Sequence, residues 1–93
     1  MTEQETYMAQ ALALAREAAA AGEVPVGCVI VRGGEIVGRG RNRREEKQST
    51  ASHAEMEAIA MANETVGSWR LDDCTLYVTL EPVSYTHLRA HET

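Results

Sequence analysis

Apolar residues recur at helical spacing over the first twenty residues of the chain. Thr2 followed three positions later by Glu5 matches a capping box, in which the side chains satisfy free N–H groups at a helix start. Gly22 is a typical helix stop. The pattern predicts an alanine-rich amphipathic helix over about residues 3–21, which could lie close against a sheet. Its periodic apolar positions are Met8, Ala11, Leu12, Ala15, Ala18 and Ala19.

Three apolar segments have the length and residue types of strands. Residues 24–31 are rich in β-branched residues and apolar on both faces, which favours a central strand covered on both sides. Gly33-Gly34 is a two-residue hairpin signal, and residues 35–40 supply the returning strand. Residues 74–80 alternate between apolar and mixed positions, which indicates a third strand.

A second helix is predicted over about residues 53–66, after a polar loop at 41–52. Ser52 is the expected N-cap and Gly67 the expected end. The apolar face of this helix is expected from Met56, Ile59, Ala60 and Val66. A helix that joins the second strand to the third implies a layered α/β fold with a mixed sheet.

Length and composition fit one small globular domain. The chain has 93 residues, of which 44% are hydrophobic and 25% charged. Its formal net charge of -5 argues against a surface that coats nucleic acid generally, so any such contact must be local. Residues 39–47 are the local exception, with five basic and two acidic residues and hence a charge of +3. This stretch could meet nucleic-acid phosphates or be an ordinary solvated loop.

Cysteine usage and the N-terminal sequence predict a cytoplasmic location. Cys28 and Cys74 form neither a CxxC pair nor a disulfide framework, so a reducing compartment is expected. Both lie in predicted strands, where we expect them to be buried apolar residues and not metal ligands. The acidic N-terminus is not a signal peptide, and residues 24–31 are too short to span a membrane.

His53-Ala54-Glu55, at the start of the second predicted helix, is the strongest candidate for chemistry. The imidazole can bind a metal, and a carboxylate two residues later can reach a metal-bound water without itself being a ligand. The positive end of the helix dipole also favours negative charge nearby. H-x-E alone is a weak signal, but the third strand ends in Thr79-Leu80-Glu81-Pro82. In zinc deaminases a Pro-Cys-x-x-Cys follows such a strand, a signature established for that family.

Five ordered blocks carry a family resemblance over about residues 5–82. Together they are similar to the bacterial tRNA adenosine deaminases of the cytidine-deaminase-like zinc deaminase superfamily. The resemblance implies a cytidine-deaminase-like three-layer α/β/α fold with a mixed sheet, truncated here after the third strand. The blocks are residues 22–27, 38–43, 53–56, 67–71 and 74–82.

The resemblance also implies a reaction and its site residues. It is the zinc-dependent hydrolytic deamination of the wobble adenosine to inosine in a tRNA anticodon stem-loop, by an enzyme that forms a homodimer. His53 would be a Zn²⁺ ligand, and Glu55 would transfer protons. Asn42 aligns with a substrate-contacting asparagine, and Val26 and Leu80 align with residues that wall the base pocket. Zinc would lower the pKa of its bound water to about 7.

The chain departs from the family pattern after Pro82. Val83 and Thr86 stand where the two cysteine ligands belong, and neither supplies a thiolate. We therefore expect this chain alone to be inactive, and we do not expect it to form the family homodimer by itself. Residues 83–93 are interpreted as a non-family tail, either disordered or foreign sequence joined after Pro82.

Three alternatives remain open from the sequence. His87 and His91 have helical spacing, but we do not expect them to replace the thiolates, because zinc ligands need precise placement and outer-shell support. A free base or nucleoside deaminase of the guanine or cytosine type shares the same zinc motifs. The blocks at 24–27 and 41–43 favour the tRNA enzymes. A non-functional truncated chain is the third possibility.

Overall fold

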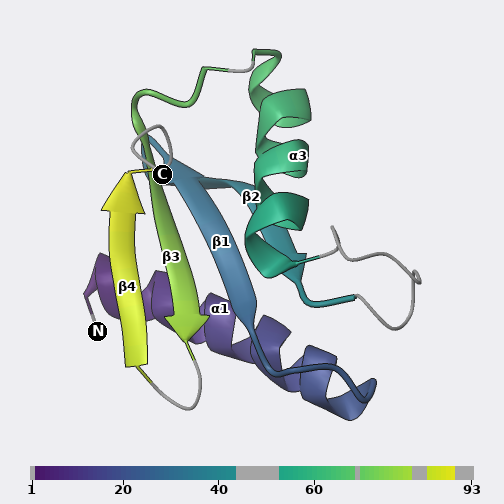
Figure 1. Cartoon of the computed structure of the whole chain (residues 1–93). Helices are drawn as coiled ribbons and strands as arrows, with labels where there is room; N and C mark the ends of the chain where they lie inside the picture. The colour runs from purple at the N-terminus through teal and green to yellow at the C-terminus, as the bar shows by residue number, and fades with distance from the viewer. Residues whose placement is uncertain (1, 44–52, 69, 81–83, 90–93) are drawn as a thin grey trace.

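Two helices and four strands make up the described fold (Figure 1). The computed structural model describes residues 2–43, 53–68, 70–80 and 84–89, and for residues 80 and 84–89 the backbone only. In chain order the elements are α1 (Glu3–Ala20), β1 (Gly27–Arg32), β2 (Glu35–Arg41), α3 (Ala54–Val66), β3 (Cys74–Leu80) and β4 (Ser84–Arg89).

The strands form one sheet in the order β2-β1-β3-β4. Each neighbouring pair is antiparallel, so the described sheet is antiparallel and not mixed as the sequence had suggested. The connection through α3 does make β2 and β3 run in the same direction. They are not neighbours, however, because β1 lies between them and pairs with both.

Strand β4 follows β3 where the sequence pattern predicted no regular element. Its backbone pairs with β3 from Leu80↔Ser84 to Thr75↔Arg89. The free N–H and C=O groups of an edge strand can be paired in this way by a following segment. Val83 and residues 90–93 lie outside the described residues, and the interpretation of 83–93 as a non-family tail stays a prediction.

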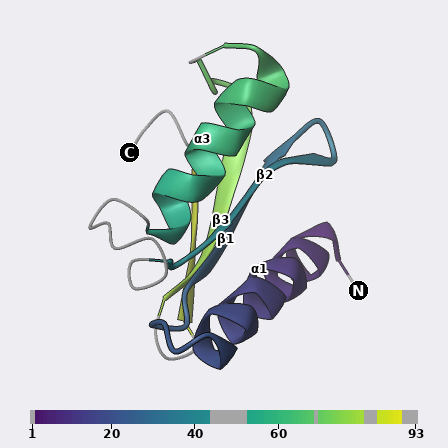
Figure 2. The same cartoon turned by 90° about the vertical axis from the view of Figure 1, so that its right-hand side faces the viewer.

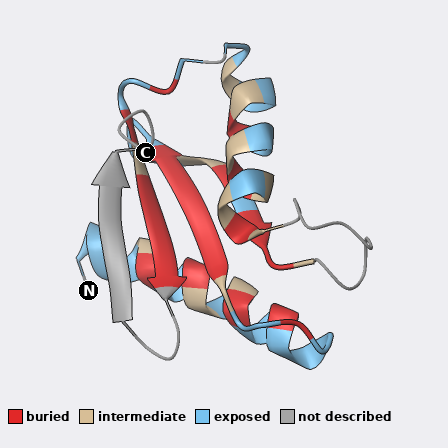
Figure 3. Ribbon diagram, in the orientation of Figure 1, coloured by how far each residue is buried: buried red, intermediate tan, exposed pale blue. Residues whose placement is uncertain are grey.

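The sheet lies between the two helices, as Figure 2 shows with the sheet seen nearly edge-on. This confirms the expected three-layer α/β/α arrangement. The central strands β1 and β3 are the most buried (Figure 3). One core cluster, on the α3 side, contains Cys28, Ile30, Ala54, Ala58, Ala62, Leu71, Cys74, Leu76 and Val78. The other, on the α1 side, contains Met8, Val29, Val31 and Tyr77.

Local signals set most of the element ends. The capping box at α1 is confirmed, because Thr2 Oγ1 accepts from the Glu5 N–H at 3.1 Å and Glu5 Oε1 accepts from the Thr2 N–H at 2.8 Å. Gly67 ends α3 in the left-handed conformation, as expected. Strand β1 starts at Gly27, three residues later than predicted, since Pro25 has no N–H to give to a ladder.

Helix α3 packs on β2 through small residues, and its predicted apolar face was partly wrong. Its buried positions are Ala54, Ala58 and Ala62, whereas Met56 is 54% exposed and Ala60 is also exposed. Only Ile59 and Val66, of the four predicted residues, pack against the core. The alanines are needed because the helix lies directly against Gly38 and Gly40 of β2. A Cβ at Gly40 would collide with the carbonyl oxygen of Ala54 and lie 2.6 Å from the Ala58 nitrogen.

Candidate active site

His53 is the N-cap residue of α3, and the prediction of Ser52 for that position was wrong. His53 has extended backbone angles (φ -86°, ψ 157°), and its carbonyl accepts the first helical hydrogen bond from the Glu57 N–H at 3.0 Å. Its side chain makes no capping bond. The imidazole therefore does not accept a hydrogen bond from the first-turn N–H groups, as the side chain of a Ser or Asp usually does at an N-cap. Ser52 itself lies outside the described residues.

Asn42 joins the end of β2 to the start of α3. Only 6% of the residue is exposed, and its Oδ1 accepts from the Ala54 N–H at 3.0 Å. Its backbone N–H donates to the Val26 carbonyl at 3.3 Å. The structure thus brings three residues singled out in the sequence, Val26, Asn42 and His53, to one end of the sheet.

Glu55 lies in the first turn of α3, on the side that faces β1. Burial, and after it the negative charge of Glu55, raise the pKa of the Cys28 thiol far above its ordinary value. Cys28 is fully buried and stays protonated at neutral pH, as expected for a cysteine that acts as a small apolar residue. Glu55 itself is partly exposed, so its carboxylate can reach a molecule bound at the helix start.

The backbone of Leu80 lies at the same end of the sheet. Strand β3 runs antiparallel to β1 with Cys28 opposite Val78, which places the end of β3 near the start of β1. The backbone of Thr86 is in β4, opposite Val78. Val83, and the side chains of Leu80 and Thr86, lie outside what the structure describes. The roles given to all site residues therefore stay predictions.

Thr79 is a residue of this end that the sequence reasoning missed. Its Oγ1 accepts from the Gly27 N–H at 2.9 Å and donates to the Gly27 carbonyl at 3.3 Å. The side chain is buried on the sheet face that α1 covers, where it continues the β1–β3 pairing by one more residue. A polar residue near the end of a buried strand is the only signal that pointed to it.

Two arginines of the basic stretch contact helix carboxylates. Arg41 Nε lies 3.9 Å from Glu17 Oε1, and Arg43 Nε lies 3.3 Å from Glu57 Oε1. The side chain of Arg41 is 11% exposed, so it is not a surface charge. These contacts weaken the case for Arg41 and Arg43 as phosphate contacts. Arg44 and Lys47 lie outside the described residues.

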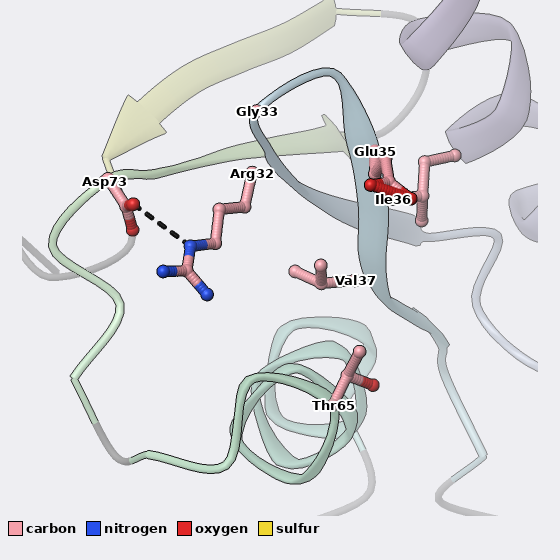
Figure 4. A pocket seen from close by; sticks show the side chains of 7 residues that line it. All are labelled: Arg32, Gly33, Glu35, Ile36, Val37, Thr65 and Asp73. Atoms are coloured by element: carbon pink, nitrogen blue, oxygen red, sulfur yellow. Dashed lines mark hydrogen bonds and ion pairs between the residues drawn. The ribbon is translucent and has the colours of Figure 1, made fainter.

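A hollow of about 430 Å³ lies at the opposite end of β1, beside the β1–β2 turn (Figure 4). There the Arg32 Nε and Asp73 Oδ2 atoms pair at 3.0 Å. The hollow is open to solvent, and none of the described residues that line it is a histidine or a cysteine. It is lined by Arg32, Gly33, Glu35, Ile36, Val37, Thr65 and Asp73.

The family follows from a match along most of the chain. Residues 1–84 match the cytidine and deoxycytidylate deaminase zinc-binding region. The chain belongs to this deaminase family. No helix in the described ranges is both long and apolar enough to cross a membrane.

Within the deaminase family, the chain is similar to two bacterial enzymes that are named tRNA-specific adenosine deaminases. It is 51% identical over 82 residues to a tRNA-specific adenosine deaminase of Streptococcus pyogenes serotype M18, covering 88% of this chain and 52% of the relative. It is 50% identical over 82 residues to the tRNA-specific adenosine deaminase of Bacillus subtilis, with 88% and 51% covered. The chain therefore spans about half the length of the curated relatives it matches.

Solved deaminase structures have the same fold. A structure from a study of A-to-I editing by tRNA:A34 deaminases at the wobble position matches with a TM-score of 0.81 at 43% identity, covering 87% of this chain and 62% of that one. The guanine deaminase of Bacillus subtilis matches with a TM-score of 0.77 at 40% identity, covering 84% and 50%. These matches confirm the predicted cytidine-deaminase-like fold.

The donor atoms of this chain do not complete the zinc site of the deaminase family. A catalytic zinc usually has three protein ligands and a water. Within the described ranges no three His, Cys, Asp or Glu side chains come together in a way that could hold a metal ion. His53 would supply one nitrogen, while the sequence places Val83 and Thr86 at the two positions after Pro82 that carry thiolates in the family signature.

Proposed function

We propose that this chain is the N-terminal part of a hydrolase that deaminates the wobble adenosine of a tRNA anticodon stem-loop to inosine. One observation carries the proposal: Val26, Asn42 and His53 meet at the end of a deaminase fold that is about half identical to the tRNA-specific enzymes. The anticodon stem-loop and the cytoplasmic location where tRNA would be met are part of this proposal. The two buried free cysteines are in keeping with a reducing compartment.

Glu55 is assigned to proton transfer. Water adds to C6 of the adenine, and the Glu55 carboxylate takes the proton that this water loses. Glu55 then gives the proton to the neighbouring ring nitrogen and later assists the departure of the amino group as ammonia, so that adenosine and water give inosine and ammonia. General acid–base catalysis by one carboxylate is worth about 10²–10⁴-fold in rate. The position of Glu55 in the first turn, beside His53, supports this role.

Asn42, Val26 and Leu80 are assigned to substrate binding. The carboxamide oxygen of Asn42 already accepts from Ala54, so its amino group is the half left to donate to the substrate. Val26 is partly buried against the α3-side core and presents an apolar surface beside the helix start. Leu80 is placed at the same end by its backbone and would form another part of the wall.

Zinc is the expected cofactor of the family, with His53 as one ligand. Because Val83 and Thr86 cannot supply thiolates, we expect the chain as printed to hold no catalytic zinc and to be inactive by itself. The family homodimer is likewise not expected from this chain alone. Activity should need a second half that carries the missing ligands.

A chimera tests whether residues 1–82 encode a competent first half. These residues would be joined to the remaining half of the Bacillus subtilis tRNA-specific adenosine deaminase, which is 50% identical over the matched region. We expect the purified chimera to form inosine in an anticodon stem-loop with adenosine at the wobble position. The chain as printed, assayed in parallel, should form none.

The Glu55→Gln chimera is the matched control. It should lose at least about a hundredfold in rate, because the proton-transferring carboxylate is gone, and should still bind zinc, because Glu55 is not a ligand. Loss of the metal, or full activity, would show that the role given to Glu55 is wrong. An active parent enzyme with an inactive chimera would count against residues 1–82 as its equivalent.

Guanine deamination is the second candidate, favoured by the TM-score of 0.77 and the 40% identity to the Bacillus subtilis guanine deaminase. The same chimera, offered guanine and cytosine as free bases, separates the two. Turnover of a free base without turnover of the stem-loop would replace the tRNA proposal with this one.

A further inference from the structure

Three alternate residues of β2 and its end face helix α3. Gly38 and Gly40 leave no space for a Cβ, because Ala58 and Ala54 approach them through their backbone atoms. Asn42 comes two residues after Gly40, and its side chain contacts the first N–H of the same helix. The two glycines determine how close α3 lies to β2. Because they have no side chains, they do not fix the position of the helix along the strand.

Asn42 is the contact in this set that does fix the helix along its axis. The four N–H groups at a helix start have no partner within the helix, and a nearby side-chain oxygen usually accepts from one of them. The N-cap residue His53 makes no such bond. Asn42 supplies the acceptor from twelve residues earlier, in a buried bond of 3.0 Å to Ala54.

We propose that Asn42 is the cap of helix α3 and, through it, the positioning residue for His53 and Glu55. Asn42 is itself fixed, because its backbone N–H donates to Val26 beside the start of β1. The two hydrogen bonds of Asn42 therefore connect the start of α3 to the end of β2 and to the start of β1. Residues 53 and 55 flank Ala54 directly, so a shift of the Ala54 N–H moves both. The inference depends on the proposed function only for the importance of these two side chains.

Hydrogen exchange in the chain as printed tests the cap. Asn42→Leu keeps the approximate size of the side chain and removes the acceptor, whereas Asn42→Asp keeps an acceptor at the same place. In Asn42→Leu we expect exchange of the first-turn amides, relative to those of residues 59–66, to rise about fivefold to tenfold. In Asn42→Asp the ratio should stay at the parent value.

A matched control and a second signal keep the test specific. Asn63 lies in the same helix, and its buried Oδ1 has no hydrogen-bond partner among the described residues. Asn63→Leu should therefore leave the first-turn exchange unchanged. The NMR signal of the His53 ring should shift in Asn42→Leu and return in Asn42→Asp, which a general loss of stability would not produce.

Three results would overturn the inference: equal first-turn exchange in all variants, an unprotected Ala54 amide in the parent, or loss of protection in Asn42→Asp as large as in Asn42→Leu. None of these readouts involves a substrate. A protected cap together with an inactive chimera would leave the positioning role intact and reject the deaminase proposal. An active chimera with no effect of Asn42 on the first-turn exchange would support the deaminase proposal and reject the positioning role.

Discussion

The two ends of strand β1 are held in different ways. At the Gly27 end, buried hydrogen bonds from Thr79 and Asn42 join β1, β3 and α3. At the Arg32 end, the Arg32–Asp73 pair has side chains that are 45% and 65% exposed, and Tyr7 donates to the Gly34 carbonyl at 2.9 Å, also at the surface. Buried polar contacts fix geometry more strongly than exposed ones, because water competes with the latter.

The difference shows where a rigid site can be built. The hollow of about 430 Å³ lies at the loosely held Arg32 end, while His53 and Glu55 lie at the end with buried polar contacts. The hollow and the candidate site therefore lie at opposite ends of β1. Catalytic side chains need support from packed neighbours more than they need a large opening in the free protein.

Gly40→Ala should have the largest effect and break the Gly27 end. The added Cβ would meet the backbone of Ala54 and Ala58, and 2.8 Å away the Cβ of Glu57, none of which can move without moving the helix. We expect a loss of about 3 kcal/mol or more in the free energy of unfolding, measured by urea denaturation.

Gly34→Ala, at the Arg32 end, is its matched control. An added Cβ there meets no described atom within 4 Å, and the positive φ of 81° leaves a cost of about 1–2 kcal/mol. Equal losses in the two variants would remove the contrast between the ends.

Thr79→Val should have an intermediate effect. Valine has nearly the same shape but leaves the buried N–H and carbonyl of Gly27 without the Thr79 hydroxyl, at a cost of about 1–3 kcal/mol. Thr79→Ser retains the hydroxyl and serves as the control. If Thr79→Val were as stable as Thr79→Ser in urea, the polar contacts of this end would not be what holds it.

Asp73→Asn should have the smallest effect. The hydrogen bond from Arg32 holds the pKa of Asp73 below its ordinary value of 3.8. The stabilisation is thus present above that pH and is lost as the pH falls below it through the lowered pKa of the folded chain. We expect the thermal melts of parent and variant to differ slightly at neutral pH in low salt, and to converge in acid or in high salt. A large difference at neutral pH would mean that the Arg32 end is held more firmly than its exposure indicates.

Local sequence signals predicted both helices and the first three strands, but neither β4 nor all of the contacts between elements. The Thr2–Glu5 capping box and Gly33-Gly34 act within a few residues, so both could be read directly. The buried face of α3 was assigned from the largest apolar residues, Met56 among them. The size of the side chains that fit on the buried face of a helix depends on how close the neighbouring strand lies. Gly38 and Gly40, inside the pattern of the second strand, were the signal for a close approach.

The candidate site was predictable as a set of residues and not as an arrangement. His53 and Glu55 follow from a short motif, and Asn42 and Val26 from the family resemblance. The N–H of Ala54 is capped by Asn42, which lies twelve residues earlier in the sequence. Capping rules consider only residues next to the helix start, and they pointed to Ser52 instead. The antiparallel pairing of β1 with β3 also joins residues that are distant in the sequence, and no local pattern in either strand specifies it.

The Asn42–Ala54 bond also bears on the order in which the chain can fold. It joins residues 12 apart in the sequence, whereas the Thr79–Gly27 bond joins residues 52 apart. Loop closure costs more conformational entropy as the loop lengthens, and contacts close in sequence form sooner. The β1–β2 hairpin and α3 are therefore expected to assemble with each other before β3 pairs with β1. During synthesis His53 and Glu55 would already be in place when the third strand leaves the ribosome.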